Sequence, residues 1–190
     1  MIRPSGPKRG GTCRCTLLQW GVSHARTPRL QLSIINASEG ERIVARTAGP
    51  SDAWADDYPQ DGDVGAVAAF PLATAAHGEQ RPFGYYRIIR LADGRVVGGI
   101  GFKGQPHGGS VELGYGLAPS ARGHRFAAEA VGALVGIAAV NGLSKVVAST
   151  TPDNIASQRS LVRAGFGLVG TDDELWYYEA LLDEDGVRTA

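Results

Sequence analysis

One junction, the fifteen residues from Leu117 to Val131, constrains the fold of this chain more than any other stretch. An apolar strand pattern ends before Pro119, a short basic turn containing Gly123 follows, and a helical pattern with small residues on its first face comes next. The first turn of a helix has backbone N–H groups without intrahelical acceptors and lies at the positive end of the helix dipole. The junction therefore predicts a strand, turn and helix with a phosphate site at the helix N-terminus.

A second segment further along the chain also predicts a strand followed by a helix. An apolar strand pattern over residues 145–151 is followed by Asn154-Ile-Ala-Ser157-Gln-Arg-Ser-Leu161-Val-Arg-Ala-Gly165-Phe166. Asparagine is a preferred helix N-cap, and glycine commonly follows a helix C-terminus. The segment predicts a helix over residues 154–164.

The two segments together resemble the GNAT superfamily of acyl-CoA-dependent N-acetyltransferases, in particular the branch of ribosomal-protein N-terminal acetyltransferases. The phosphate loop of that family reads Arg/Gln-x-x-Gly-x-Gly/Ala, and the corresponding stretch here is Arg122-Gly-His-Arg-Phe-Ala127, followed by Glu129-Ala130. Arg125 stands where the family has glycine. The second motif matches more fully, and the resemblance covers residues 83–182.

The resemblance implies a fold, a cosubstrate and a reaction. The fold is α/β (α+β): a mixed, mostly antiparallel twisted sheet flanked by helices and splayed between two central strands, residues 111–117 and 145–150. Acetyl-CoA would bind in the splay, and its acetyl group would pass directly to a primary amine of a small molecule or of a protein N-terminus. The alternative is a non-catalytic acyl-CoA-binding or regulatory module of the same fold. The implied cofactor-binding residues are Leu117, Arg122, Gly123, His124, Arg125, Phe126, Ala127, Asn154 and Ser157.

Glu112 is the candidate general base, because many members of the family place a glutamate near the start of this strand. A primary amine is mostly protonated at neutral pH, so a proton acceptor assists its attack. On an alternating strand Glu112 shares a face with Gly114 and Gly116, which leaves room for a substrate. The alternative is a surface carboxylate on a half-exposed strand.

Ser157 is the candidate for protonating the leaving thiolate, itself or through a water. Leu161 occupies the place where the family often has a tyrosine. A serine that bonds a carbonyl one helical turn back is the alternative.

Asn154 either binds the pantetheine arm or only caps the helix. Arg122 and Arg125 at the positive end of a helix dipole are unfavourable without an anion, which supports a phosphate site.

Trp54 and Tyr58 are the candidate acceptor-binding residues. The resemblance places the acceptor wall in their segment, residues 50–63. The carboxylates of this segment would favour a cationic amine, although a solvated loop is equally compatible. Its five carboxylates have no basic neighbour in the segment: Asp52, Asp56, Asp57, Asp61 and Asp63. No metal site is expected, because Cys13 and Cys15 lack the usual two-residue gap and a second ligand pair.

Length and charge suggest one acidic domain with a basic tail. A chain of 190 residues can bury its own core. Residues 1–38 hold six basic residues and no acidic one, and the rest holds thirteen basic and nineteen acidic residues. We expect a disordered extension over 1–29 and a single domain over 30–190. The sequence has no apolar signal region or spanning segment, so we expect a cytoplasmic protein, a monomer or homodimer, without membrane or nucleic-acid partners.

Other elements follow from local patterns. Strands are expected over 30–37, 83–91, 96–103, 167–170 and 175–182, and helices from a capping box at Ser38 and Glu41 to about 47, from after 63 to about 76, and over 123–140. Asp93-Gly94 predicts a hairpin turn. Residues 99–104 fit Gly-x-Gly-x-x-Gly, but Pro106 and the glycines after it cannot start the helix that a dinucleotide site needs. We interpret them as a glycine-rich strand end.

Overall fold

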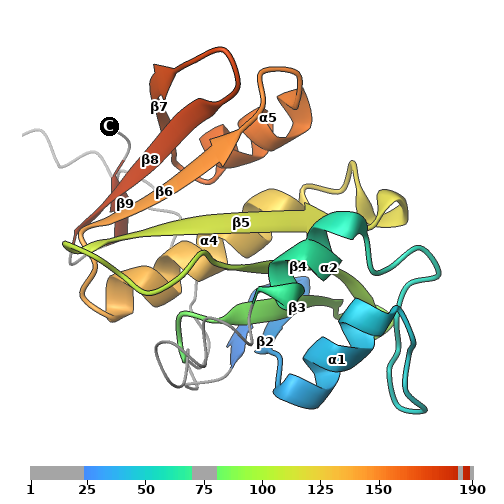
Figure 1. Ribbon diagram of the computed structural model, residues 1–190. Helices are drawn as coiled ribbons and strands as arrows, with labels where there is room; N and C mark the ends of the chain where they lie inside the picture. The colour runs from blue at the N-terminus through green and yellow to red at the C-terminus, as the bar shows by residue number, and fades with distance from the viewer. Residues whose placement is uncertain (1–23, 70–80, 184–185, 189–190) are drawn as a thin grey trace, which may run out of the picture.

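The computed structural model of the chain describes residues 24–69, 81–183 and 186–188. These residues form one nine-stranded sheet in the order β1-β2-β3-β4-β5-β6-β8-β7, with β9 paired to β8 (Figure 1). Only β5 and β6 are parallel, and every other pair is antiparallel. The expected fold class is therefore confirmed. The strands are β1 His24–Arg26, β2 Leu30–Ile34, β3 Tyr85–Arg90, β4 Val96–Phe102, β5 Ser110–Leu117, β6 Lys145–Thr150, β7 Gly167–Thr171, β8 Trp176–Asp183 and β9 Gly186–Arg188.

The two parallel strands separate after three residue pairs, so the expected splay is confirmed. Ser110–Glu112 of β5 pairs with Lys145–Val147 of β6, and the pairing then stops. Beyond that point β5 stays paired to β4 on its other edge, and β6 stays paired to β8. Figure 1 shows β6, β7, β8 and α5 leaning away from β5 as a separate wing. The β5 edge that faces this wing is left open to a ligand.

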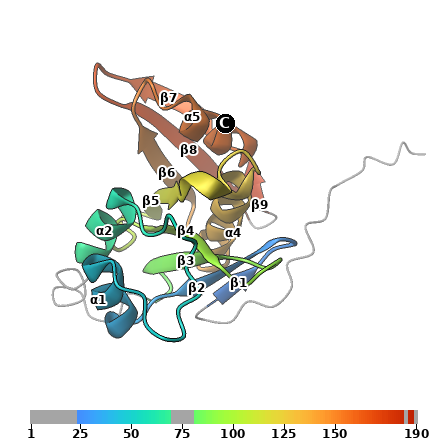
Figure 2. The same ribbon diagram turned by 90° about the vertical axis from the view of Figure 1, so that its right-hand side faces the viewer.

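Helices cover both faces of the sheet (Figure 2). Helices α1 (Ala37–Ala45) and α2 (Asp61–Ala68) lie on one side, and α4 (Phe126–Val140) lies on the other. Helix α5 (Ile155–Arg163) packs beside β6 and α4. The buried side of α4 repeats at helical spacing, through Ala130, Leu134 and Ala138, which fixes the face that it turns to the sheet.

The N-terminal ends of both helices on the α1 side differ from expectation. The capping box of α1 is formed by Asn36 and Glu39, two residues before the predicted pair: Asn36 Oδ1 accepts from the Glu39 N–H at 2.9 Å. Asparagine and serine cap about equally well, so tertiary packing decides, and this start buries Gly40 and Ile43. Helix α2 begins at Asp61 rather than after residue 63, and the expected helical residues 70–76 lie outside the described part of the chain.

Strand β1 lies on the N-terminal side of residue 30, where we expect the domain to begin. It pairs with β2 from His24 to Arg26, and residues 1–23 lie outside the described ranges. Two other predicted features, the β3–β4 turn and the C-terminal end of α4, are confirmed. Gly94 adopts φ +72° in the β3–β4 turn, and Gly142 follows α4 with φ +77°. Helix α4 begins at Phe126 rather than at Gly123, since Gly123 and Arg125 both have positive φ.

No helix in the described ranges is long and apolar enough to cross a membrane.

Candidate active site

The predicted phosphate loop is the turn between β5 and α4. Gly123 has φ +83° and Arg125 has φ +62°, and α4 starts at the next residue, Phe126. Arg125 thus takes up the left-handed conformation that a glycine adopts without strain, at a cost of about 1–2 kcal/mol. Arg125 therefore takes the place of the family's glycine in this turn, and the first N–H groups of α4 have no intrahelical acceptor.

Two arginine side chains, Arg29 and Arg122, hold this loop in place. Arg122 Nε donates to the Leu117 carbonyl at 3.1 Å, and Arg29 Nη1 donates to the His124 carbonyl at 3.0 Å. The Arg29 guanidinium lies 4.9 Å from the centre of the Phe126 ring, on which His124 also stacks. The side chains of Arg122, His124 and Arg125 are exposed, so this helix end presents positive charge and N–H donors to solvent.

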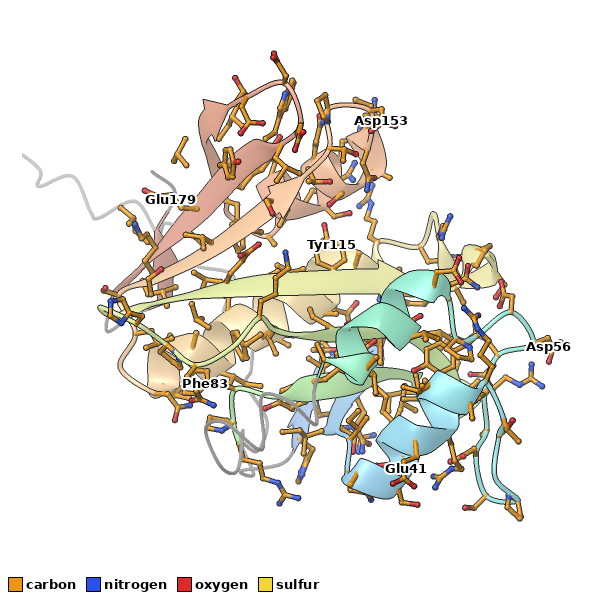
Figure 3. All side chains as sticks on the ribbon, viewed as in Figure 1. Glu41, Asp56, Phe83, Tyr115, Asp153 and Glu179 are labelled. Atoms are coloured by element: carbon orange, nitrogen blue, oxygen red, sulfur yellow. The ribbon has the colours of Figure 1, made fainter. Side chains whose placement is uncertain are left out.

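A side-chain contact between Tyr115 of β5 and Ser157 of α5 bridges the splay. The Tyr115 hydroxyl lies 2.9 Å from Ser157 Oγ and 3.1 Å from the Ser157 carbonyl oxygen. Figure 3 shows Tyr115 pointing from β5 toward the wing. Burial raises the pKa of Tyr115, and the bond to Ser157 opposes that rise. Asn154 accepts from the Ser157 N–H at 3.1 Å and caps α5, as the sequence predicts.

Glu112 lies where the splay begins, and both of its described donors contact one oxygen. Lys103 Nζ lies 2.6 Å and Ser149 Oγ 3.0 Å from Glu112 Oε1. Its carboxylate therefore ties β5 to the end of β4 and to β6. The Glu112 side chain is about one-third exposed, and its described hydrogen bonds are both made by Oε1.

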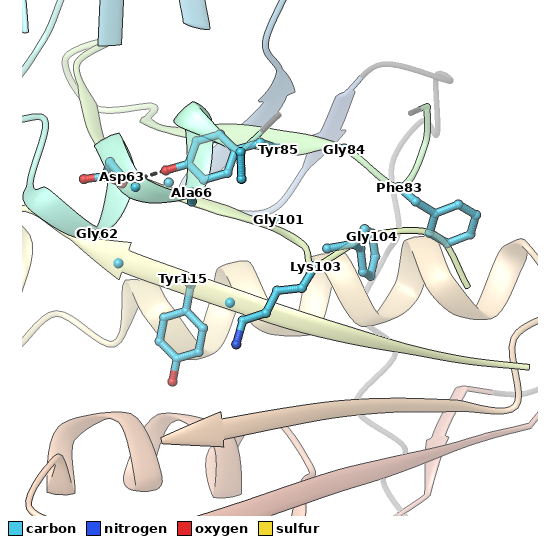
Figure 4. A pocket seen from close by; sticks show the side chains of 16 residues that line it. Gly62, Asp63, Ala66, Phe83, Gly84, Tyr85, Gly101, Lys103, Gly104 and Tyr115 are labelled. Atoms are coloured by element: carbon cyan, nitrogen blue, oxygen red, sulfur yellow. Dashed lines mark hydrogen bonds between the residues drawn. The ribbon is translucent and has the colours of Figure 1, made fainter. Parts of the chain in front are cut away.

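A cavity of about 580 Å³ lies on the α2 side of β3, β4 and β5 (Figure 4). Its floor consists of glycines, and at Gly99 an added Cβ would lie 1.7 Å from the Tyr85 hydroxyl. The cavity therefore exists because these strand positions have no side chain. Apolar groups and two charged side chains complete the lining in the described residues: Phe83, Phe102, Ala66, Ala69, Tyr85, Tyr115, Asp63 and Lys103.

Asp63 is held inside this cavity by two hydrogen bonds. The Tyr85 hydroxyl donates to Asp63 Oδ1 at 2.7 Å, and the Gln60 N–H donates to Oδ2 at 2.8 Å. The second bond is the capping box of α2. Asp63 is 3% exposed, and burial raises the pKa of its carboxyl group, although the hydrogen bond from Tyr85 opposes the rise.

The sequence profile of the acetyltransferase (GNAT) domain matches residues 29–167. The chain belongs to the GNAT acetyltransferase family. The uncharacterised N-acetyltransferase YjdG of Bacillus subtilis is 27% identical to it over 112 residues, 58% of this chain and 67% of that protein. Two solved structures share the fold. The ribosomal-protein-S5-alanine acetyltransferase of Vibrio fischeri has 15% identity and a TM-score of 0.61, covering 83% of this chain and 96% of its own.

The second structure is RimL, the ribosomal L7/L12 α-N-protein acetyltransferase, in complex with coenzyme A. It has 19% identity and a TM-score of 0.60, and the match covers 84% of this chain and 97% of that one. The chain described here is thus a GNAT acetyltransferase, an acyltransferase enzyme, as the sequence motifs predict.

The acidic segment of this GNAT domain is largely neutralised by the fold, which corrects the expectation of carboxylates without basic neighbours. Arg42 Nε lies 2.6 Å from Asp52, Arg95 lies 3.0 Å from Asp56, and Arg46 pairs with Asp61. Asp57 accepts from the N–H and hydroxyl of Ser120, and the backbone bond is the first cause of its lowered pKa. Only Asp63 of these five carboxylates lines the 580 Å³ cavity.

Trp54 and Tyr58 are close to each other but outside that cavity. Their rings pack edge to face at 5.4 Å, and both border a second, much smaller cavity beside α1. Tyr58 is buried, and its hydroxyl has no hydrogen-bond partner among the described residues. Their acceptor-binding role stays a prediction. In the described ranges no three His, Cys, Asp or Glu side chains form a metal-binding group.

Four residues that the sequence analysis did not single out shape the site: Lys103, Ser149, Tyr85 and Tyr115. Lys103 and Ser149 are 46 positions apart, and both contact Glu112 Oε1 because β4 and β6 flank β5. Tyr115 offered one signal, since it lies three residues from Glu112 on the strand that the motif identifies. Its contact with α5 depends on the splay and has no local signature.

Proposed function

We propose that this chain transfers the acetyl group of acetyl-CoA directly to a primary amine bound in the 580 Å³ cavity. The observation that carries the proposal is the position of the cavity. Gly114, Tyr115 and Gly116 border the cavity, and they lie on the stretch of β5 whose other edge is open to the splay. A thioester in the splay and an amine in the cavity would therefore meet at β5.

The coenzyme has a binding surface on both sides of the splay. The pyrophosphate would lie on the N-terminus of α4, from Arg122 to Ala127, where N–H donors and two exposed arginines converge. The pantetheine arm has amide groups that would pair with the open edge of β5 up to Leu117, as an added strand does. Asn154 and Ser157 border the far side. RimL, which shares the fold, was solved with coenzyme A.

The chemistry requires a neutral amine and a stable leaving group. The amine nitrogen attacks the thioester carbon, the tetrahedral intermediate collapses, and the C–S bond breaks with its electron pair on sulfur. The nitrogen loses one proton to solvent and keeps one as the amide N–H. The thiolate takes a proton from the Tyr115 and Ser157 hydroxyl pair, and solvent restores that proton. A thiol pKa of about 8.5 means that this last step needs little assistance.

Glu112 is the proton acceptor that the resemblance implies, and its contacts support a different role. Its Oε1 already accepts from Lys103 and Ser149, and Glu112 is not among the described residues that line the cavity. These contacts favour Glu112 as the residue that fixes the point where β5 and β6 separate.

The acceptor itself is a small amine or the first residue of a protein N-terminus, since a cavity of this volume is typical of small-ligand sites.

The test is coenzyme A binding and turnover by the full chain. Coenzyme A at millimolar concentration should raise the melting temperature, because a ligand that binds only the native state stabilises it. Gly123→Asp places a carboxylate against the pyrophosphate and should abolish the shift while the fold survives. Release of free thiol from acetyl-CoA with a panel of amines should then identify accepted substrates. A wild-type protein without any thermal shift would overturn the proposal.

A further inference from the structure

The 580 Å³ cavity has one carboxylate that the described structure leaves without an ion-pair partner. Of the two charged side chains among its described lining residues, Lys103 is paired with Glu112 at 2.6 Å. Asp63 receives only the neutral donors of Tyr85 and Gln60, and Arg46, a nearby cation, is paired with Asp61. A buried carboxylate without a cation is costly, and a bound ammonium group would remove that cost.

Asp63 also lies over the part of β5 where the amine and the thioester would meet. A Cβ added at Gly116 would be 4.0 Å from Asp63 Oδ1, and one added at Gly99 would be 2.8 Å from it. Figure 4 shows Asp63 and Tyr85 together at one end of the glycine floor. Glu112 is four residues from Gly116 along β5, about 13 Å at the rise of a strand. One nitrogen atom therefore cannot contact both carboxylates.

We propose that Asp63, positioned by Tyr85, is the carboxylate that binds the ammonium group of the acceptor and takes its proton. This inference rests on the proposed function and names its acceptor class. An N–H bond of the ammonium breaks and an O–H bond forms on Asp63. The freed nitrogen lone pair forms the N–C bond to the acetyl group, and the C–S bond breaks. The attacking nitrogen loses a second proton to solvent and keeps one as the amide N–H. The proton on Asp63 also passes to solvent, and the thiolate is protonated from the Tyr115 and Ser157 pair.

The rest of the lining specifies what surrounds the amino group. Phe83, Phe102, Ala66 and Ala69 offer no partner for a carboxylate or phosphate, and the charge of Lys103 is matched by Glu112. The acceptor class is therefore a primary alkyl or arylalkyl amine without an anionic group beside the amine. An α-amino acid would place its carboxylate against Asp63 or against the apolar wall.

The pH dependence of kcat/KM should report the titration of Asp63, given the groups that face it. Tyr85 from β3 and Tyr58 from the segment before α2 both have pKa values raised by burial, so both stay neutral near pH 7. Arg46 at the end of α1 is paired with Asp61, and the described residues of β4 and β5 beside Asp63 Oδ1 are Gly99 and Gly116. An acidic limb in kcat/KM would thus report the Asp63 carboxyl group, whose pKa burial raises.

The experiment compares three variants of the full chain on a simple alkylamine. Asp63→Asn should lower kcat/KM by ~10²–10⁴ and keep the coenzyme A thermal shift. Asp61→Asn is the matched control, because it removes the same charge two residues away at an exposed position, and it should keep the wild-type rate. Tyr85→Phe removes a hydrogen bond to the charged carboxylate, so the acidic limb should move to higher pH.

The outcomes separate this inference from the proposed function. Absence of the coenzyme A shift and of turnover in the wild type would remove the proposed function. An Asp63→Asn protein that turns over within threefold of the wild-type rate, with the same pH profile, would overturn the Asp63 assignment while turnover itself stands. If Asp63→Asn fails to fold, Tyr85→Phe decides, and an unmoved acidic limb rejects the assignment. Equal use of an alkylamine and the corresponding amino acid would overturn the substrate class.

Discussion

Arg29 and Glu129 are a hundred residues apart in the chain and form a two-pronged ion pair. Arg29 Nε and Nη2 lie 2.7 and 2.6 Å from Glu129 Oε2, and the Arg29 N–H donates to Oε1 at 2.9 Å. The Thr27 hydroxyl also donates to Oε1, at 2.5 Å. Because Arg29 holds the His124 carbonyl as well, the β1–β2 turn supports the phosphate loop through the first turn of α4.

Glu129→Ala should therefore lower both stability and coenzyme A affinity. The variant removes the carboxylate that accepts from both Arg29 and Thr27, and the loss of a charge-assisted network of this kind costs about 1–3 kcal/mol. Chemical denaturation and calorimetric titration with coenzyme A measure the two effects. Asp93→Ala breaks the exposed Arg90–Asp93 pair and serves as the control, with little expected change. An unchanged affinity in Glu129→Ala would show that the loop keeps its geometry without the Arg29–Glu129 ion pair.

Gly116→Ala should raise the KM for the amine without weakening coenzyme A. Its Cβ would meet only Asp63 Oδ1, at 4.0 Å, so the fold tolerates the methyl group while the floor of the cavity rises toward the carboxylate. Gly99→Ala is the contrasting variant. Its Cβ would overlap the buried Tyr85 ring, so both stability and acceptor binding should fall. Steady-state kinetics at fixed acetyl-CoA and thermal melts distinguish the two, and a wild-type KM in Gly116→Ala would contradict the position of the acceptor.

Tyr115→Phe and Ser157→Ala should each lower kcat by about tenfold or less, because a thiolate leaves with little help from an acid. The two hydroxyl groups share one hydrogen bond, so the double variant should lose less than the product of the single losses. Pre-steady-state measurement of thiol release provides the rates. Fully multiplicative losses would mean that the two hydroxyls act independently.

Glu112→Gln separates the role implied by the resemblance from the role that its contacts support. A general base predicts a loss of ~10²–10⁴ in kcat/KM that shrinks at high pH, as the amine loses its proton unaided. We expect a loss below tenfold and a lower melting temperature, because glutamine keeps an acceptor for Ser149 and gives up the ion pair with Lys103. A large, pH-dependent loss would restore Glu112 as the base.

The sequence predicted those parts of the fold that depend on local pattern. Strands β2 to β8, the Asp93-Gly94 turn, the Asn154 cap and the turn before α4 each have signals within a few residues, whereas β1 and β9 were not predicted. The start of α1 was missed because Asn36 and Ser38 are nearly equivalent caps, and core packing chooses between them. Asp63 could not be separated from its four acidic neighbours, since only the folded chain shows which of them face arginine and which faces the cavity.

The stability of the protein should carry a signature of Asp63 that is independent of turnover. Burial raises the pKa of Asp63 in the folded state, so the folded chain retains a proton at a pH where the unfolded chain has lost it. Below the unfolded pKa, near ~4, both states are protonated and Asp63 has no effect on stability. As the pH rises toward the folded pKa, the unfolded state is increasingly favoured, by about 1.4 kcal/mol for each pH unit that separates the two pKa values.

The free energy of unfolding of Asp63→Asn relative to wild type should thus increase from pH 4 toward neutral pH and then level off. Urea titrations across this range measure the difference, with Asp61→Asn as the exposed control for the loss of one charge on the same helix turn. A difference that stays flat or decreases with rising pH would show that the carboxylate is as well stabilised inside the cavity as in water, and would remove the reason for an ammonium group to bind there.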